Sequence, residues 1–360
     1  MIDTTHSITF ILGTRPEIIK LAPVIRACER RDISYSIIHT GQHYSDELDT
    51  VFFEQLELPA PTHNLQIGSG THGEQTGEMI IGIESILLKE NPDVVLVQGD
   101  TNSVLAGAIA TGKLDIELGH VEAGLRSFDR EMPEETNRVL ADHTAEYLFA
   151  PTDESARLLR EEGLPADRIF VTGNTIVDSV EQNRQLSERK STVLTDLGLE
   201  DNSFALMTAH RSENVDDEDR FSSLLEGINR IATQADLEVI YPVHPRSADC
   251  IDAFNLTIPP TVKTVPSQDF LDFLQLEANA DIVFTDSGGV QEETCILQTP
   301  CVTVRDNTER PETVEVGANT LAGVDPEAIV DSAEAMLRRS RDWENPFGDG
   351  RAADRILAAL

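Results

Sequence analysis

The sequence is poor in lysine, in long apolar runs and in paired cysteines, and each shortage excludes a class of protein. Lys and Arg total 28 of the 360 residues, against 64 Asp and Glu, for a formal net charge of −36. Such a surface repels the phosphates of nucleic acids and of anionic membranes, so we expect neither as a partner. We attribute the charge to adaptation to high salt, where screening is nearly complete.

No apolar run reaches the roughly eighteen residues that a transmembrane helix needs. The run Ile8–Leu12 follows Met1 closely, without a basic segment or a cleavage site, so we expect a cytoplasmic protein. The cysteines are scattered and lack metal-ligand spacing. We therefore expect reduced, structural thiols at Cys28, Cys250, Cys295 and Cys301.

Short apolar runs alternate with segments of helix length along the whole chain. This alternation predicts parallel sheets with helices on both faces, and hence an α/β fold of two Rossmann-like, doubly wound domains facing a central cleft. The strands expected in the first half are Ile8–Leu12, Tyr35–His39, Val94–Val97, Glu117–Val121, Tyr147–Ala150 and Ile169–Thr172. Those in the second half are Phe204–Ala209, Glu238–Val243, Val262–Val265, Asp281–Thr285, Cys301–Val304 and Thr320–Leu321.

A polar stretch, Glu181–Asn202, separates the two sets of strands. We therefore expect an N-terminal domain at 1–178 and a C-terminal domain at 179–345. The remaining segment, 346–360, is predicted to be a short helix that packs back on the N-terminal domain.

The most informative segment follows the apolar strand Asp281–Phe284 and leads into a predicted helix. Its turn, Ser287-Gly288-Gly289, offers free backbone N–H groups and the positive end of a helix dipole, which favours a bound phosphate or diphosphate. Glu292 or Glu293, one turn further on, can reach a ribose hydroxyl. The alternative is an ordinary strand-to-helix turn.

A second turn with phosphate-binding character follows the first strand. Gly13 permits a sharp turn, Pro16 suits the first helical position, and Arg15 and Lys20 can reach a phosphate. The dinucleotide pattern G-x-G-x-x-G is missing, which disfavours a nicotinamide or flavin cofactor. The alternative is a conventional helix start with surface cations.

Three carboxylates follow separate predicted strands of the N-terminal domain, namely Asp100, Glu122 and Glu134. Clustered carboxylates raise one another's pKa, which suits removal and return of a proton near neutral pH. Capping of helix starts is the alternative role for each.

Histidine and arginine dominate the strand ends of the C-terminal domain, where His210, Arg211, His244, Arg246 and Arg310 stand. His210 and Arg211 can donate to a diphosphate or protonate it as it leaves. A structural role is equally open for His244. The division suggests that the nucleotide binds the second domain and the reacting group the first.

No metal site is predicted. The other histidines lack paired spacing with a carboxylate on one helix, and this holds for His39, His43, His63, His72, His120 and His143. A nucleophile elbow of the G-x-S-x-G kind is missing too.

Taken together, these segments resemble the non-hydrolysing UDP-N-acetylglucosamine 2-epimerases, in order along nearly the whole chain. The motifs are GTRPE at 13–17, TGQH at 40–43, QGDT at 98–101, VEAGLRS at 121–127, MPEETNR at 132–138, VTGN at 171–174, AHRSEN at 209–214, PVHP at 242–245, TDSGGVQEE at 285–293, RDNTERPE at 305–312 and NPFGDG at 345–350. The resemblance implies a GT-B type fold, a homodimer, and interconversion of UDP-N-acetylglucosamine and UDP-N-acetylmannosamine without metal, NAD or another cofactor.

The resemblance also assigns roles to individual residues. The family's catalytic positions match Asp100, Glu122, Glu134 and His210. Its nucleotide-binding or phosphate-binding positions match Arg15, Lys20, Arg138, His244, Ser287, Gly288, Gly289, Glu293 and Arg310. The implied mechanism expels UDP to form a glycal and then adds it back, but which carboxylate serves which sugar face stays open.

Four other functions compete with this interpretation. A GT-B glycosyltransferase would share the fold, although no acceptor groove is recognisable. An epimerase for another UDP-2-acetamido sugar, such as a diacetamido uronate, would share the motifs. A silent sugar-nucleotide sensor would have lost the three acids, and a hydrolysing epimerase would differ in its products.

Overall fold

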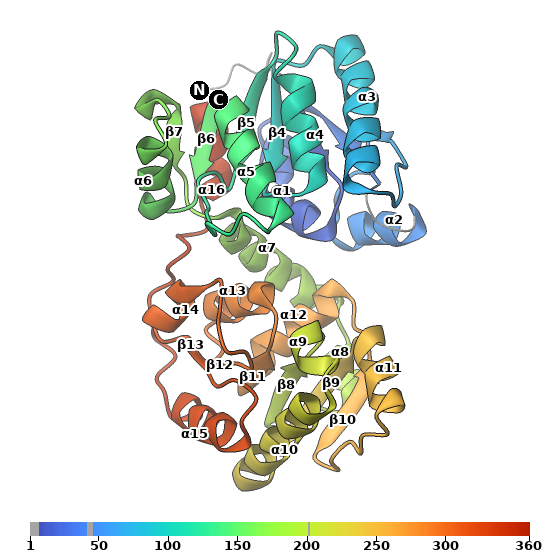
Figure 1. Ribbon diagram of the computed structural model, residues 1–360, viewed down its shortest axis with the longest axis vertical. Coiled ribbons are helices and arrows are strands. Elements are labelled where there is room, and N and C mark those ends of the chain that lie inside the picture. Colours follow the sequence, from blue (N-terminus) through green and yellow to red (C-terminus); the bar gives the residue numbers. More distant parts are fainter. Residues whose placement is uncertain (1–6, 42–45, 201) are drawn as a thin grey trace. The chain divides into compact units, whose positions relative to one another are not determined.

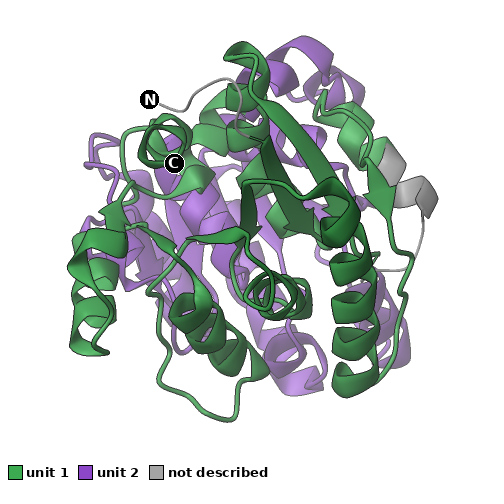
Figure 2. Cartoon of the chain, turned by 90° about the horizontal axis from the view of Figure 1, so that it is seen from above, with its two compact units in different colours: residues 1–182, 347–360 green, residues 183–346 purple. Residues whose placement is uncertain are grey.

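The computed structural model of the chain describes residues 7–41, 46–200 and 202–360, which form two compact units (Figures 1 and 2). Unit 1 holds the described residues up to Gln182 together with Phe347–Leu360, and unit 2 is Asn183–Pro346. The sequence predicts boundaries at 178/179 and 345/346. Each unit has its own sheet and core.

The described part of unit 1 contains a parallel sheet of seven strands in the order β3-β2-β1-β4-β5-β6-β7 (Figure 1). Six of the strands lie where the apolar runs predicted them. The two-residue edge strand β3 was not predicted, because two residues carry no periodic signal. The strands are β1 (Ser7–Leu12), β2 (Ser34–His39), β3 (His63–Asn64), β4 (Val94–Gln98), β5 (Glu117–Val121), β6 (Tyr147–Ala150) and β7 (Ile169–Val171).

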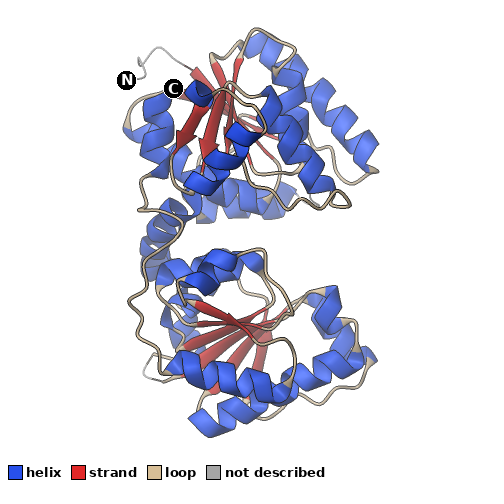
Figure 3. Cartoon of the chain, turned by 60° about the vertical axis from the view of Figure 1, so that its left-hand side comes forward, coloured by secondary structure: helices blue, strands red, loops and turns tan. Residues whose placement is uncertain are grey.

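Helices cover both faces of this sheet, as Figure 3 shows. On one face, Ile11 of β1 packs in a cluster with Met79 of α3 and Val104 of α4, whereas α1 lies on the other face (Figure 1). Right-handed crossovers explain the division, because the strand order reverses at β1. The helices are α1 (Arg15–Arg30), α2 (Asp46–Gln55), α3 (His72–Glu90), α4 (Asn102–Thr111), α5 (Pro133–Thr144), α6 (Asp153–Glu161), α7 (Thr175–Lys190) and α16 (Ala352–Ala359), with a 3-10 turn at Ala166–Arg168.

Helix α16 belongs to unit 1 and packs on α1. The backbone N–H groups of Ala352 and Ala353 donate to the buried carboxylate of Asp178, at 3.1 and 3.0 Å. Arg31, directly after α1, forms an ion pair with Asp354 at 2.5 Å. An acidic side chain at a helix start satisfies N–H groups that have no partner within the helix, which fixes the returning segment.

Unit 2 contains, in its described residues, a parallel sheet of six strands in the order β10-β9-β8-β11-β12-β13. Its strands are β8 (Phe204–Thr208), β9 (Glu238–Val243), β10 (Val262–Pro266), β11 (Ile282–Thr285), β12 (Cys301–Thr303) and β13 (Asn319–Leu321). Its helices are α8 (Val193–Leu197), α9 (Ser212–Val215), α10 (Glu218–Ala235), α11 (Pro245–Ala253), α12 (Phe270–Asn279), α13 (Gly288–Leu297), α14 (Pro311–Glu315) and α15 (Pro326–Leu337).

The two faces of the unit 2 sheet have separate apolar cores. Phe221 of α10 and Ile329 of α15 pack on one face, and Leu276 of α12 and Val290 of α13 pack on the other. Two parallel-sheet α/β domains, predicted from the alternating apolar runs, are thus confirmed. None of the described helices is long and apolar enough to cross a membrane.

Candidate active site

The turn after β1 is built around a glycine that has no room for a side chain. A Cβ at Gly13 would overlap the hydroxyl oxygens of Thr40 and Ser103, which lie 2.8 Å from each other. The turn delivers Arg15 to the first position of α1, where its side chain is exposed and its guanidinium lies over the ring of Phe52, 5.7 Å from the centroid. Arg15 therefore presents a cation at the carboxyl edge of the sheet.

The same turn is held by Glu17, a buried carboxylate of α1 whose role the sequence did not reveal. Glu17 accepts hydrogen bonds from Gly13 N at 2.9 Å, Thr14 Oγ1 at 2.8 Å and Thr101 Oγ1 at 2.7 Å. Burial raises the pKa of Glu17 to about 7, although these hydrogen bonds act in the opposite direction. Glu17 thus ties the turn after β1 to the turn after β4.

Glu122, directly after β5, is the most constrained of the predicted acids. Its backbone has a φ of +72°, a conformation that is strained for a residue with a side chain, and its N–H donates to Phe149 O at 3.1 Å. Lys20 Nζ donates to both carboxylate oxygens, at 2.7 and 2.8 Å, and Gln98 Nε2 donates to one of them. The carboxylate is 6% exposed and is fixed in direction by a cation and an amide.

Asp100 and Glu134 differ from Glu122 in their surroundings. Arg138 forms an ion pair with Asp100 and a second one with Glu135 at 3.0 Å, so this arginine lies beside an acid of the predicted site. Asp100 and Glu122 stand at the ends of the neighbouring strands β4 and β5. Glu134 lies exposed in the first turn of α5 and makes no hydrogen bond or ion pair with the residues described.

In unit 2, His210 follows β8 and is held by Asp286, a buried residue that follows the adjacent strand β11. Asp286 Oδ2 accepts the backbone N–H groups of His210 and Arg211, both at 2.9 Å, and Oδ1 lies 3.0 Å from His210 Nδ1. Burial alone would raise the pKa of Asp286, but these contacts outweigh it and lower the pKa. Nε2 of the half-exposed ring is thereby directed away from Asp286.

His244 stands beside His210, with 5.6 Å between the ring centroids. Its Nδ1 accepts the backbone N–H of Arg246 at 3.2 Å and so caps α11. Burial, His210 and Arg246 all lower the pKa of His244, which favours the neutral ring with its proton on Nε2. His244 therefore has both a structural role and a free direction for donation.

The turn Ser287-Gly288-Gly289 leads into α13 as predicted, and no side chain caps this helix start. A Cβ at Gly288 or Gly289 would meet nothing closer than 3.9 Å, so the space above the two glycines is open. Backbone N–H groups that point into open space at a helix start form an anion-binding arrangement.

Two acidic residues follow this turn on α13, and each has a distinct neighbour. Glu292 Oε1 lies 2.6 Å from Arg310 Nε, so Arg310 is drawn to this carboxylate. Glu293 lies against Glu277 of α12, which is fully buried. Burial and the neighbouring Glu293 raise the pKa of Glu277 well above its ordinary value, which favours the neutral acid beside a predicted ribose ligand.

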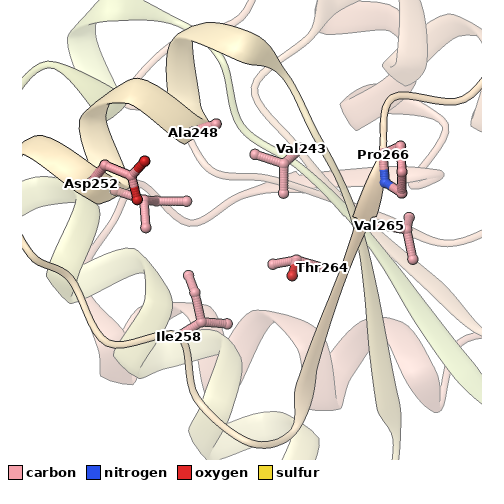
Figure 4. Close-up of a pocket in the computed structure, with 8 residues that line it drawn as sticks. Val243, Ala248, Asp252, Ile258, Thr264, Val265 and Pro266 are labelled. Atoms are coloured by element: carbon pink, nitrogen blue, oxygen red, sulfur yellow. The ribbon is translucent and has the colours of Figure 1, made fainter.

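Neither of two cavities in unit 2 contains a predicted site residue. One of about 390 Å³ lies between α11 and the edge strand β10 (Figure 4), and its walls are Val243, Ala248, Ile251, Asp252, Ile258, Thr264, Val265 and Pro266. A wider opening of about 880 Å³ lies at the amino ends of the strands, near Ser203, Glu238 and Asp281. Mostly apolar walls, or a position at the amino edge, do not suit a diphosphate.

No group of three or more His, Cys, Asp or Glu side chains in the described ranges is arranged to hold a metal ion. The cysteines Cys28, Cys250, Cys295 and Cys301 are free thiols, as predicted. Residues 42 and 43, which include His43 and complete the TGQH motif, lie outside the described ranges.

Comparison with known proteins places the chain in a family. The sequence model of the family described as UDP-N-acetylglucosamine 2-epimerase matches residues 26–360. The chain belongs to the UDP-N-acetylglucosamine 2-epimerase family. A member from Methanocaldococcus jannaschii, named UDP-N-acetylglucosamine 2-epimerase, is 53% identical over 359 residues, which cover 98% of each chain.

Two further relatives bear on the ligand. The crystal structure of the Methanocaldococcus jannaschii UDP-GlcNAc 2-epimerase in complex with UDP-GlcNAc and UDP has a TM-score of 0.84 and 53% identity to this chain, with 98% of each chain covered. A UDP-2,3-diacetamido-2,3-dideoxy-D-glucuronate 2-epimerase from Pseudomonas aeruginosa is 41% identical over 354 residues, covering 97% of this chain and 98% of the relative. The likeness to the Methanocaldococcus jannaschii crystal structure confirms the GT-B type fold.

Three residues of this epimerase-family site were not predicted from the sequence as functional, namely Glu17, Gln98 and Asp286. Each is a buried polar residue within the motifs GTRPE, QGDT and TDSGG: Gln98 and Asp286 stand at strand ends, and Glu17 lies in the first turn of α1. Polar residues directly after apolar strands were the available signal, but their partners lie on other strands and are invisible in one sequence.

Proposed function

We propose that this chain interconverts UDP-N-acetylglucosamine and UDP-N-acetylmannosamine. Glu122 gives the main support: a carboxylate held between Lys20 and Gln98 at a strained backbone position is suited to proton transfer. The 53% identical relative from Methanocaldococcus jannaschii carries this enzyme name, and its crystal structure holds UDP-GlcNAc and UDP.

The reaction must invert a carbon whose proton is not acidic. The C2 proton of the sugar is not adjacent to a carbonyl, so direct deprotonation would be slow. Instead, the bond between C1 and the UDP oxygen breaks while a carboxylate takes the C2 proton, which leaves a C1=C2 double bond in a glycal. A proton then returns to the opposite face of C2, and the UDP oxygen returns to C1.

The acids of unit 1 carry the proton. Glu122, Asp100 and Glu134 are the candidate bases and acids, and more than one is needed because the proton leaves one face and arrives at the other. Lys20 and Arg138 orient the carboxylates of Glu122 and Asp100 until substrate arrives, in addition to their proposed contacts with the substrate.

The donors of unit 2 and Arg15 of unit 1 stabilise the leaving diphosphate. His210, oriented by Asp286, donates a proton or a hydrogen bond to the departing oxygen, and the N–H groups of the turn at Ser287–Gly289 bind the phosphates. Glu293 binds the ribose hydroxyls. His244 and Arg310 complete the set of nucleotide-binding residues.

The proposed reaction has no redox step, because the hydrogen at C2 leaves and returns as a proton. It therefore proceeds without NAD, and the cations of the site replace a metal in neutralising the diphosphate. We further propose a homodimer that works at high salt, in keeping with the net charge of −36.

An epimerase for a differently substituted UDP-2-acetamido sugar is the second candidate. The 41% identical relative from Pseudomonas aeruginosa, named for a diacetamido uronate, favours it. Both candidates share elimination and re-addition of UDP, and they differ in the groups that contact C3 and C6 of the sugar.

Proton NMR of the purified chain with UDP-N-acetylglucosamine in D2O, at high salt and without added metal or NAD, tests the proposal. We expect new anomeric signals of UDP-N-acetylmannosamine, with deuterium at C2. An unchanged sugar together with demonstrated UDP binding would contradict the first candidate, and turnover of the UDP-diacetamido uronate in the same tube would establish the second.

A further inference from the structure

His120, the fourth residue of β5, lies in a buried ion network that the proposed mechanism does not use. Its ring is 0% exposed, with Nδ1 at 2.7 Å from Asp142 Oδ1 and Nε2 at 2.8 Å from the backbone carbonyl oxygen of Gly99. A carboxylate and a carbonyl can only accept hydrogen bonds, whereas a neutral imidazole has a single N–H. Both contacts can be hydrogen bonds only if the ring carries two protons.

The charges around the ring agree with an imidazolium. Asp142 Oδ2 lies 2.7 Å from Arg126 Nη1, and Arg126 in turn donates to Glu162 at 2.6 and 2.7 Å. With His120 protonated, two cations balance two carboxylates. A neutral ring would leave an uncompensated negative charge in a region that excludes water, which is costly.

The network joins the two turns that carry catalytic candidates. Gly99, whose carbonyl accepts from His120, directly precedes Asp100 in the turn after β4. Gly124, whose N–H donates to Asp142 Oδ2 at 3.1 Å, lies two residues after Glu122 in the turn after β5. Both glycines have positive φ, at +84° and +83°, which glycine adopts without strain, and each gives its turn a freely rotating backbone that hydrogen bonds from outside can fix.

We propose that His120 is a positioning residue that, as a buried imidazolium bridging Asp142 and the Gly99 carbonyl, holds Asp100 and Glu122 in register for proton transfer. The role in proton transfer rests on the proposed function above, whereas the protonation of the ring and its two hydrogen bonds do not depend on it. A displacement of about 1 Å between catalytic groups can reduce the rate about a hundredfold, so a bridge between two such turns matters for turnover.

Burial alone would lower the pKa of His120, but Asp142, the Gly99 carbonyl and the charge of Glu122 outweigh it and raise the pKa. The pKa of Asp142 is lowered, since His120 and Arg126 outweigh its burial. A raised histidine pKa stabilises the fold fully below the unfolded-state value, and this stability is lost as pH rises through the folded value. The charged groups around the ring are Asp142 from α5, Glu122 directly after β5, and Arg126. Arg126 also forms an ion pair with Glu162.

Two amide variants test separately the two hydrogen bonds of His120, to Asp142 and to the Gly99 carbonyl. The amide nitrogen of glutamine reaches about as far as Nε2, and that of asparagine about as far as Nδ1. His120→Gln keeps the donor to Gly99 and loses that to Asp142, whereas His120→Asn does the reverse. We expect both to lower kcat, by between about tenfold and a hundredfold for His120→Asn, with KM within about twofold, and less for His120→Gln. His63→Asn, at an edge strand and paired with Glu90, is the matched control.

The ring can also be observed directly in the intact wild-type protein. With selectively nitrogen-labelled histidine, a nitrogen–proton correlation spectrum at pH 7.5 distinguishes an imidazolium from either neutral tautomer, and His120→Gln assigns the signal. We expect two retained N–H protons that persist to alkaline pH. A neutral tautomer at pH 7.5, or equal kcat for wild type and both variants, would overturn the proposal. Because the spectrum needs no substrate, it stands even if wild type shows no epimerase activity.

Discussion

The two units share a fold but hold the groups proposed to transfer protons in opposite ways. In unit 1, cations hold carboxylates: Lys20 binds Glu122, and Arg138 binds Asp100. In unit 2, a carboxylate holds a histidine, because Asp286 binds both the ring and the backbone of His210. A group that must take a proton needs to stay ionised, and a group that must give one needs a partner that stabilises its positive form.

The difference lies in the turns and not in the sheets. Both sheets are parallel, and both bring their site residues to the carboxyl edge, where strands meet helix starts. The strained Glu122 and the open glycine turn at 288–289 show how one edge can be made a proton-transfer site and another an anion site. Function is thus set by a few residues after each strand.

The largest effect is expected for Glu122→Gln, which removes the best-held carboxylate of unit 1. The amide keeps the shape of the side chain but cannot take a proton, so turnover should fall at least about a hundredfold, as loss of a catalytic acid or base does. Binding of UDP, measured by calorimetry, should be little changed, because Glu122 is proposed to act on the sugar and most of the groups proposed to bind UDP lie in unit 2. Epimerisation followed by NMR supplies the rate.

A matched control for that variant is available on the same strand. Glu117 stands at the amino end of β5, where its carboxylate accepts from Tyr147 OH at 2.9 Å. Glu117→Gln makes the same chemical change at the edge away from the site and should leave turnover unchanged. Wild-type turnover in Glu122→Gln would remove Glu122 from the mechanism.

Much of this arrangement could be predicted from the sequence, and the rest could not for identifiable reasons. The strands were predictable because runs such as Val94–Val97 are buried on both faces and read as continuous apolar segments. Strand ends then located Asp100 and Glu122. Their partners were not predictable, because the contact between Lys20 and Glu122 joins residues far apart in the sequence and depends on helix orientation.

Charge pairing accounts for contacts of two arginines that the sequence did not indicate. Arg138 and Arg310 were expected to bind the nucleotide, and the structure places them beside Asp100 and Glu292. In a chain with 64 acidic residues, most arginines near an edge find a carboxylate, and one sequence does not indicate which. Their contacts with substrate stay predictions.

An intermediate effect is expected for Asp286→Asn, which removes the negative charge that holds His210 in unit 2. The amide can still accept the backbone N–H groups, but it removes the negative charge beside His210 Nδ1. We expect kcat to fall about tenfold, the scale of losing a buried ion-pair partner of the histidine, with weaker UDP binding by calorimetry. Asp281→Asn at the amino end of β11, 3.7 Å from Arg341, is the control and should behave as wild type. Equal effects in both variants would point to a general loss of stability.

The smallest effect is expected for Glu277→Gln, because the raised pKa of Glu277 favours its neutral form in the native protein. Its pKa is raised by burial and by Glu293, so the folded state retains a proton that the unfolded state releases. Native stability therefore decreases as pH rises above the unfolded-state value and towards the folded one. Glutamine supplies a neutral donor beside Glu293 at every pH, so KM should stay within about twofold of wild type.

The sharper measurement for this pair is thermal unfolding at several pH values. The melting temperature of Glu277→Gln should rise relative to wild type as the buffer becomes more alkaline, because the variant has no proton to lose. Glu226→Gln, at an exposed position paired with Arg230, is the control and should show no such trend. A difference in melting temperature between Glu277→Gln and wild type that does not change with pH would mean that Glu277 is ionised beside Glu293. Unit 2 would then have no neutral acid to set against the cation-paired acids of unit 1.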